Sequence, residues 1–195
     1  MVRFVSRRFA RAAIRAGAIG CVAALLSAPP SAGPALAADP NPVPAVPKGD
    51  PAMNAAFARA AATLDAFLAA WRNPPHGAGR FAVKIGLVDT PNAPGYAVAP
   101  PGAPGSIEWF WARDLRAEGA GFSARLANDP DMLRNVSIGQ VVRFTRQDIG
   151  DWMYWQDNKI VGNATACPAL AHASADRRRE MKERYGLDCD QTANP

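Results

Sequence analysis

Hydrophobic positions between residues 50 and 72 recur with the spacing of a helix. Asp50-Pro51 is typical of a helix start, with an N-cap carboxylate followed by proline at the first helical position. Asn73-Pro74-Pro75 then ends the pattern. One apolar stripe runs between these signals and predicts an amphipathic helix that lies across a sheet; it consists of Met53, Phe57, Ala60, Leu64, Phe67, Leu68 and Trp71.

The spacing then changes to the alternation of half-buried strands, which we expect over residues 80–88, 106–112 and 122–126. In the first of these, Phe81, Val83, Ile85 and Leu87 share one face, and Lys84 lies on the other. Residues 89–105 are crowded with Pro and Gly, and we interpret them as a disordered insertion.

Residues 137–162 continue the strand pattern with an unusual density of aromatic side chains. We expect a strand over 141–144, an acidic turn over 148–151 and an aromatic strand over 152–155. Asp157-Asn158 is a good two-residue hairpin turn, and a last strand follows over 159–164. A second helix is predicted over 174–185, with Gly186 as its C-terminal stop.

These elements predict an α+β fold. A mainly antiparallel, curled sheet of five to six strands would be packed by one N-terminal helix. We place this domain at residues 50–166 and a helical tail at 167–195. Cys167 and Cys189 are the two cysteines of that part of the chain, and in an exported protein two such cysteines most often pair, so a disulfide would tether the C-terminal helix.

The first 37 residues read as a signal peptide. Five arginines precede an apolar run over 16–28, and Ala35-Leu36-Ala37 supplies a cleavage site. The run is too short to span a bilayer, so we expect no membrane span after cleavage and a periplasmic or secreted product. Ser6-Arg7-Arg8-Phe9 resembles a twin-arginine export signal, although Phe9 stands one place early. Residues 38–49 are rich in proline and predict an extended linker.

The net charge of +5 belongs to this leader, because its five arginines are accompanied by no acidic residue. The remaining 158 residues hold equal numbers of basic and acidic side chains. A nucleic-acid partner is therefore not expected, since it would need a basic face on the folded domain.

Three acids are the candidates for proton-transfer chemistry: Glu108, Asp148 and Asp151. Paired carboxylates suit general acid–base catalysis where burial separates their pKa values. The competing interpretation is that Asp148 and Asp151 shape a tight turn by accepting backbone N–H bonds. We favour that second interpretation.

Aromatic residues form the second constellation, and we treat them as a candidate binding surface for a protein or an envelope ligand: Trp109, Trp111, Trp152, Tyr154 and Trp155. With a period of two, Trp152 and Tyr154 share one face of their strand and Trp155 lies on the other. The competing interpretation is that a second core or the C-terminal helix covers the exposed side.

The two histidines add little. His172 with Cys167 and Cys189 has no recognised zinc spacing, and we predict neither a metal nor a cofactor. His172 and nearby Ser174 lack a patterned third member for a nucleophilic system. His76 is expected at the exposed helix–strand connection.

Five short motifs occur in order within residues 57–165. They are EWFW at 108–111, GFSARLANDP at 121–130, IGQVV at 138–142, IGDWMY at 149–154 and KIVGNAT at 159–165. Together they resemble the YegJ-like bacterial family of unknown function, most specifically at Asp151-Trp152-Met153-Tyr154. Ala124 stands where Gly is usual in that family, and Gln140 where Asp is usual. The resemblance implies a fold and no activity, because no catalytic residue is assigned in the family.

The sequence thus favours an exported domain that binds a partner without catalysis and without a cofactor. The alternative is a small periplasmic hydrolase that uses the carboxylates of Glu108 and Asp151. An enzyme would bring these acids together, whereas a binding module would present an apolar patch with a polar rim.

Overall fold

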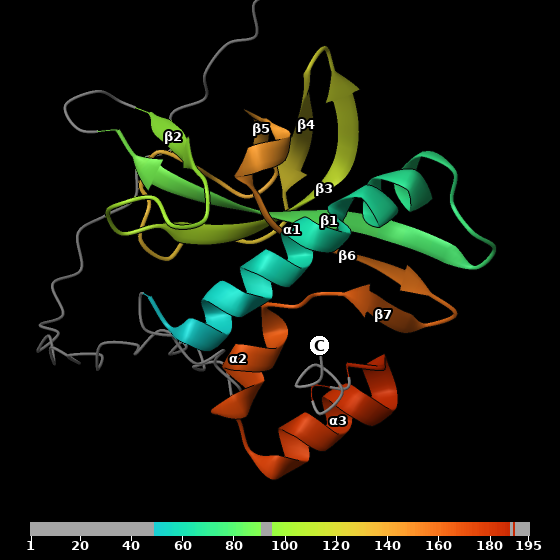
Figure 1. Cartoon of the computed structure of the whole chain (residues 1–195). Helices are drawn as coiled ribbons and strands as arrows, with labels where there is room; N and C mark the ends of the chain where they lie inside the picture. The colour runs from blue at the N-terminus through green and yellow to red at the C-terminus, as the bar shows by residue number, and fades with distance from the viewer. Residues whose placement is uncertain (1–48, 91–94, 188, 190–195) are drawn as a thin grey trace, which may run out of the picture. The chain divides into compact units, whose positions relative to one another are not determined.

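The computed structural model describes residues 49–90, 95–187 and 189, drawn as the coloured ribbon in Figure 1. The expected signal peptide and the expected linker up to residue 48 lie outside the described residues. None of the helices in the described ranges combines the length and the apolar character needed to cross a bilayer.

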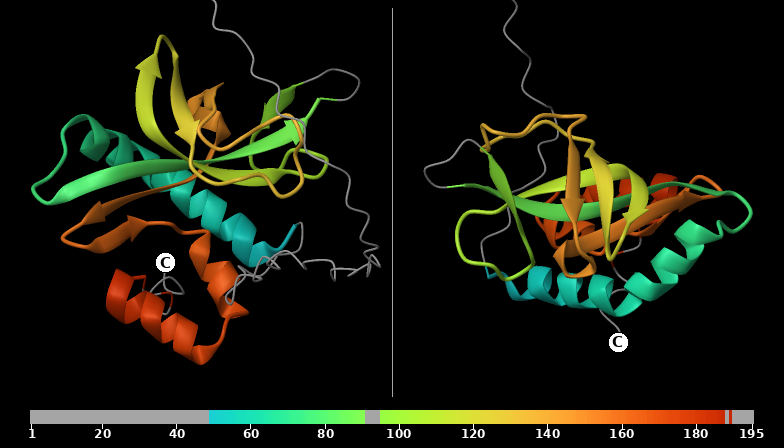
Figure 2. Two further views of the ribbon diagram at one scale, coloured as in Figure 1. Left: turned by 180° about the vertical axis from the view of Figure 1, so that it is seen from behind. Right: turned by 90° about the horizontal axis from the view of Figure 1, so that it is seen from above.

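Helix α1 (Pro51–Arg72) begins where the capping pattern predicts. Asp50 Oδ1 accepts the backbone N–H of Met53 at 2.7 Å, and the helix ends at Arg72 with Asn73 as its C-cap, ahead of two prolines. Its buried stripe, which confirms the centre of the predicted one, consists of Ala56, Ala60, Leu64, Phe67 and Leu68. Both views of Figure 2 show α1 running along one side of the sheet.

Seven strands form one open sheet in the described part of the chain, and every pairing between them is antiparallel. Six of them lie in the order β5-β4-β3-β1-β6-β7, and β2 pairs with β1. Their bounds are β1 (Ala78–Asp89), β2 (Tyr96–Ala99), β3 (Glu108–Glu118), β4 (Gly121–Leu126), β5 (Val141–Phe144), β6 (Ile149–Gln156) and β7 (Lys159–Gly162). The α+β class with a mainly antiparallel sheet and an N-terminal helix is confirmed.

Strand β2 lies inside the stretch that the sequence suggested to be a disordered insertion, and that interpretation is wrong for residues 96–99. β1 pairs with β3 along one edge, and its other edge pairs first with β6 and then, over residues 86–89, with β2. Tyr96-Ala97-Val98-Ala99 supplies the missing partner for this end of β1. The flanking prolines and glycines hid a strand of only four residues.

The expected acidic turn is shorter than predicted. A single 3-10 turn, η1 (Arg146–Asp148), contains Asp148, and β6 begins immediately after it at Ile149. Asp151 therefore lies inside a strand and not in a turn. The hairpin at Asp157-Asn158 is confirmed, with φ angles of 48° and 63° that match a type I′ turn.

Strand β3 continues six residues beyond its expected end and bends on the way. The register with β4 shifts between Arg113 and Arg116, and Asp114 between them has a φ of 58°. Such a bulge bends a strand and increases its twist. In Figure 1 the end of β3 and strand β4 accordingly rise away from the β1–β6 part of the sheet.

The core lies between α1 and one face of the sheet. Val83, Ile85 and Leu87 of β1 are fully buried there, with Phe110 of β3 beside them. Trp152 of β6 stacks on Phe67 with ring centroids 5.2 Å apart. We call this side of the sheet the core face.

The tail carries two helices where the sequence predicted one. The short helix α2 (Ala166–Ala171) precedes α3 (Ala175–Tyr185), which starts at the N-cap Ser174 and ends at Gly186 with a φ of 76°. The predicted disulfide is confirmed between Cys167 and Cys189. It ties α2 to the chain that follows α3.

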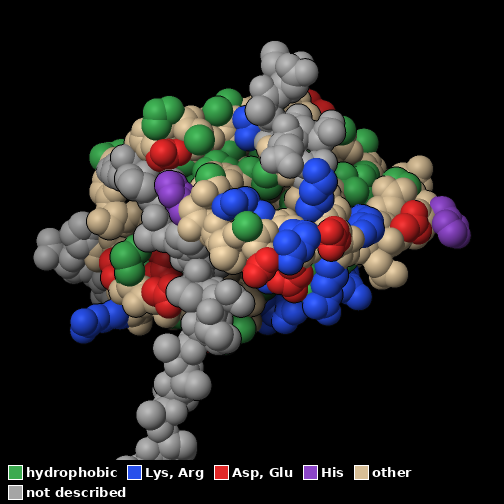
Figure 3. All heavy atoms as spheres, turned by 90° about the horizontal axis from the view of Figure 1, so that it is seen from below, with side chains coloured by type: hydrophobic (Ala, Val, Ile, Leu, Met, Phe, Trp, Pro, Cys, Tyr) green, Lys and Arg blue, Asp and Glu red, His purple; other side chains and the backbone are tan. Residues whose placement is uncertain are grey.

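The basic run of α3 is largely neutralised by acidic side chains of the same helix. Arg177 pairs with Glu180 and Arg179 pairs with Asp176, each at 2.7 Å. Figure 3, which views the molecule from below, shows Lys and Arg side chains interspersed with Asp and Glu. This surface has the mixed character of a solvated helix face.

Candidate functional site

The side of the sheet opposite the core face carries the features that packing of the core does not explain, and we call it the second face. Residues directly opposite each other on antiparallel strands point to the same side. Trp111 of β3, Lys84 of β1 and Asp151 of β6 form one such row across three strands. A neighbouring row runs from β5 to β6 through Val141, Arg125, Arg113, Ala82 and Met153.

The five aromatic residues proposed as one binding surface are divided between the two faces. Trp152 is 8% exposed on the core face, and its Nε1 donates to the Ala60 carbonyl at 3.0 Å. Tyr154 stacks on Phe81 at 5.0 Å, against the core. Trp109, Trp111 and Trp155 lie on the second face and are each half-buried. The structure therefore separates Trp152 and Tyr154 from the other three.

Trp109 is held in place by close packing against helix α1 and two strands. Its ring lies 4.8 Å from the ring of Phe57, and a Cβ on Gly150 would come within 2.5 Å of Trp109 Cζ3. Gly86, directly opposite Trp109 on β1, would bring a Cβ within 3.3 Å of Trp109 Cη2. The two glycines thus make room for this indole, and Trp109 is the most structural member of the second face.

Trp155 is partly covered, as the competing interpretation proposed. Tyr185 of α3 contacts it edge-on at 5.8 Å, and the guanidinium of Arg80 lies 5.1 Å from its ring centroid. Trp155 nevertheless keeps part of its surface accessible. Trp111 is likewise half-buried, with the ammonium of Lys84 4.7 Å from its ring centroid.

A buried polar network lies beside Trp111 and centres on Asp151, which is 1% exposed. Asp151 Oδ1 accepts the N–H groups of Trp152 at 2.8 Å and Ala164 at 3.3 Å. Oδ2 accepts the N–H of Thr165 at 2.8 Å and its hydroxyl at 2.7 Å. The Thr165 hydroxyl in turn accepts a hydrogen bond from Lys84 Nζ at 2.5 Å. Both carboxylate oxygens are thus occupied, and the network fixes the connection from β7 to α2.

The pKa of Lys84 is lowered from its ordinary value, because burial removes the hydration of its ammonium, while the charge of Asp151 opposes the shift. In the pH window between this lowered pKa and the unfolded value of about 10.4, the unfolded chain binds more protons than the native state. The contribution of Lys84 to the free energy of unfolding should therefore increase as the pH rises through that window.

We expect the free energy of unfolding of the native protein to increase relative to that of a Lys84→Met variant as the pH rises from 7 toward 10. Urea titrations at several pH values measure this difference. Lys159→Met, which removes the same charge from an exposed strand position, corrects for general charge effects. The lowered pKa of Lys84 would be contradicted if Lys84→Met and Lys159→Met changed the free energy of unfolding by amounts that vary with pH in the same way.

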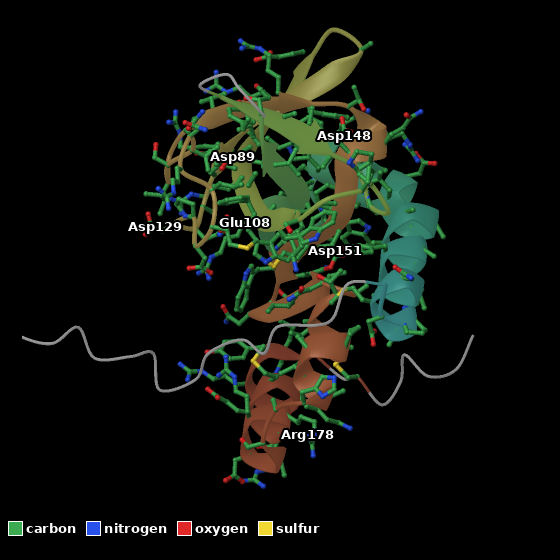
Figure 4. The ribbon with its side chains drawn as sticks, turned by 90° about the vertical axis from the view of Figure 1, so that its left-hand side faces the viewer. Asp89, Glu108, Asp129, Asp148, Asp151 and Arg178 are labelled. Carbon is green, nitrogen blue, oxygen red and sulfur yellow. A yellow bond between two sulfur atoms is a disulfide. The ribbon has the colours of Figure 1, made fainter. Side chains whose placement is uncertain are left out.

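Glu108 and Asp151 do not meet. Glu108 lies opposite Leu87 on the core side of β3, whereas Asp151 lies opposite Lys84, three positions away on β1 and therefore on the other face. Strand β1 also separates β3 from β6. Figure 4 shows Glu108, Asp148 and Asp151 at three distinct places.

Each of the three candidate acids accepts backbone N–H groups. Glu108, 7% exposed, accepts those of three consecutive residues, Asp131 at 2.5 Å, Met132 at 3.0 Å and Leu133 at 2.8 Å. Asp148 accepts the backbone N–H and the hydroxyl of Thr145, both at 2.7 Å. The interpretation of Asp148 and Asp151 as backbone-binding carboxylates is confirmed, although Asp151 does so from a strand.

The remaining candidates lie apart from these acids. His76 and His172 are exposed, and Ser174 Oγ accepts the N–H of Arg177 at 3.2 Å as the cap of α3. Within residues 49–90, 95–187 and 189, no group of three or more His, Cys, Asp or Glu side chains is arranged to hold a metal ion. Sequence reasoning missed Lys84 and Thr165, and the only signal for Lys84 was its position on the polar side of an alternating strand.

Comparison with known proteins places the chain within a bacterial group of unknown activity. The chain is 33% identical to the uncharacterized protein YegJ of Escherichia coli (strain K12) over 78 residues, which are 40% of this chain and about half the length of that relative. No solved structure shows a significant match. Residues 50–189 match the family described as "Uncharacterized protein conserved in bacteria (DUF2314)". This match covers more than two thirds of the chain, including the sheet and the helices α1, α2 and α3 of the described residues, and the protein therefore belongs to the DUF2314 family.

Proposed function

We propose that this protein is an exported, non-catalytic binding module that holds a protein or an envelope ligand against the second face of its sheet. One observation carries the proposal: the indoles of Trp111 and Trp155 remain partly exposed, although the core face buries Trp152. Large aromatic side chains that the core does not absorb are the usual anchors of binding surfaces. Export is supported by the arginine-rich, apolar and A-x-A pattern of residues 1–37.

The engagement of the acids supports binding over hydrolysis. A hydrolase that used Glu108 and Asp151 would need both carboxylates beside one substrate. The two acids lie on opposite faces of the sheet, and their oxygens are engaged by backbone N–H groups. Carboxylates of this kind hold backbone segments in place. The aromatic surface is therefore the better-supported site.

We expect a Trp111→Ala/Trp155→Ala double variant to lose the partner that the native protein captures from an envelope extract. Truncation of an anchoring Trp typically costs at least about 2 kcal/mol of binding free energy. The measurement is affinity capture with the full chain as bait, with circular dichroism used to establish that the variants are folded.

Trp71→Ala is the matched control, because Trp71 is also half-buried but packs against Phe122 on the core side. It should capture the same partner as the native chain. Equal capture by the double variant and the native protein would overturn the proposed function.

A further inference from the structure

The second face concentrates positive charge in a domain that is otherwise balanced. Arg113 of β3 and Arg125 of β4 lie directly opposite each other, and both are exposed. Lys84 lies one row away beside Trp111, and Arg80 lies over Trp155. Residues 38–195 contain equal numbers of basic and acidic side chains, so this clustering is a property of the face and not of the composition.

The pair of Arg113 and Arg125 is unfavourable for the fold alone, because like charges directly opposite on neighbouring strands destabilise a sheet. Asp114 lies 3.7 Å from Arg125, with both side chains at least half exposed, and such a pair contributes little. Arg125 also donates to the Gly139 carbonyl at 2.6 Å. These contacts hold Arg125 in place without neutralising both guanidinium groups.

The acid at the centre of the second face, Asp151, offsets the charge of Lys84, which lies opposite it, whereas Arg113 and Arg125 lie in the next row. Asp151 is buried, and its two oxygens accept four hydrogen bonds from Trp152, Ala164 and Thr165. Further along β3, Glu118 is engaged by Ser123 at 2.6 Å and by Arg143 at 2.8 Å. The carboxylates near the cationic row are therefore already committed within the fold.

Apolar positions are interleaved with the cations. Val141, 46% exposed, lies opposite Arg125 at one end of the row, and half-buried Met153 lies opposite Ala82 toward the other end. Trp111 is next to Arg113 on the same side of β3. A ligand that matches this surface needs carboxylates and apolar or aromatic side chains at alternating places.

We propose that the second face docks an acidic, aromatic-containing segment of a protein partner. Carboxylates of that segment pair with Arg113 and Arg125, which relieves their mutual repulsion, and its aromatic side chains lie against Trp111 and Met153. Polypeptide supplies both kinds of group at the spacing of a strand row, whereas a phosphate polymer supplies the charge alone. This inference rests on the proposed function and specifies the chemistry of the partner.

The test uses a defined probe, a random copolymer of glutamate and tyrosine, titrated against the full chain by fluorescence anisotropy. We expect binding that weakens as the ionic strength rises. We expect Arg113→Glu, which reverses one charge of the row, to weaken binding at least about tenfold, the scale measured for charge pairs at interfaces. Arg178→Glu is the matched control, because it makes the same charge change on α3 at a place apart from Asp151 of the second face (Figure 4), and it should bind the copolymer as the native chain does.

Three outcomes would overturn the inference. They are equal affinities of the Arg113→Glu and Arg178→Glu variants, binding of a lysine–tyrosine copolymer as tight as that of the glutamate–tyrosine copolymer, and stronger binding to phosphatidylglycerol vesicles than to either copolymer. If Trp111→Ala/Trp155→Ala lost the partner while Arg113→Glu still captured it fully, the proposal of an acidic partner would be rejected and the proposed binding function would stand. If both variants still captured the partner, the proposed binding function and the proposal of an acidic partner would both be rejected.

Discussion

Replacement of Asp151 by alanine is expected to destabilise the protein by about 3–5 kcal/mol, the cost of removing one partner from a buried charged network. Three backbone N–H groups, of Trp152, Ala164 and Thr165, would lose their acceptor. Each buried donor left without a partner costs about 1–3 kcal/mol. Lys84 would also keep a desolvated ammonium without the nearby negative charge. The midpoint of urea unfolding, followed by circular dichroism, measures the loss.

Two variants calibrate this expectation. Asp151→Asn keeps one acceptor oxygen and should show an intermediate loss. Asp148→Ala removes a half-buried carboxylate that caps a single turn at Thr145, and it should cost about 1 kcal/mol. If Asp151→Ala were no more destabilising than Asp148→Ala, the buried network would not have the structural role that we assign to it.

Replacement of Glu108 by alanine is expected to cost about 3 kcal/mol and to loosen the connection between β4 and β5. Its carboxylate accepts the N–H groups of Asp131, Met132 and Leu133, with that of Leu133 in a buried contact. Without the carboxylate these three amides need another acceptor, and water can reach the two that are only partly buried. The loss of stability should therefore be smaller than the cost of three buried N–H groups without a partner. Hydrogen exchange at residues 131–133, together with urea unfolding, measures both effects.

Glu183→Ala, at an exposed position of α3, is the control and should change stability by less than about 0.5 kcal/mol. A catalytic Glu108 would behave differently from a structural one. Active-site groups are often held at a cost in stability, so their removal tends to stabilise the fold. A gain in stability on Glu108→Ala would therefore contradict the structural role and return Glu108 to the catalytic candidates.

Much of the fold could be predicted from the sequence because its signals are local. The N-cap and proline at Asp50-Pro51 fix the start of α1, and alternation over residues 80–88 identifies β1 and its buried side. Asp157 and Asn158 tolerate the positive φ angles that the last hairpin needs. The two cysteines of the domain and tail have each other as partners, as the disulfide confirms.

The rest depends on register and on contacts between distant residues. Strand β2 exists because one end of β1 has an unpaired edge, which no local pattern in residues 96–99 reveals. Local alternation already separates Trp155 from Trp152 and Tyr154, but the face that they share with the indoles of β3 is set by the registers of β3 and β6 with β1, which the sequence does not encode locally. Lys84 and Thr165 are 81 positions apart and meet only because β6 pairs with β1 and β7 pairs with β6.

The central place of β1 has a consequence for how the chain acquires its structure. β1 ends at Asp89, but one of its long edges is completed by β6, which begins at Ile149. A nascent polypeptide cannot satisfy that edge until some sixty further residues have been made, and closure of so distant a pairing is slow compared with local hairpins. That edge of β1 therefore stays unpaired, and its apolar side chains stay uncovered, until β6 is available.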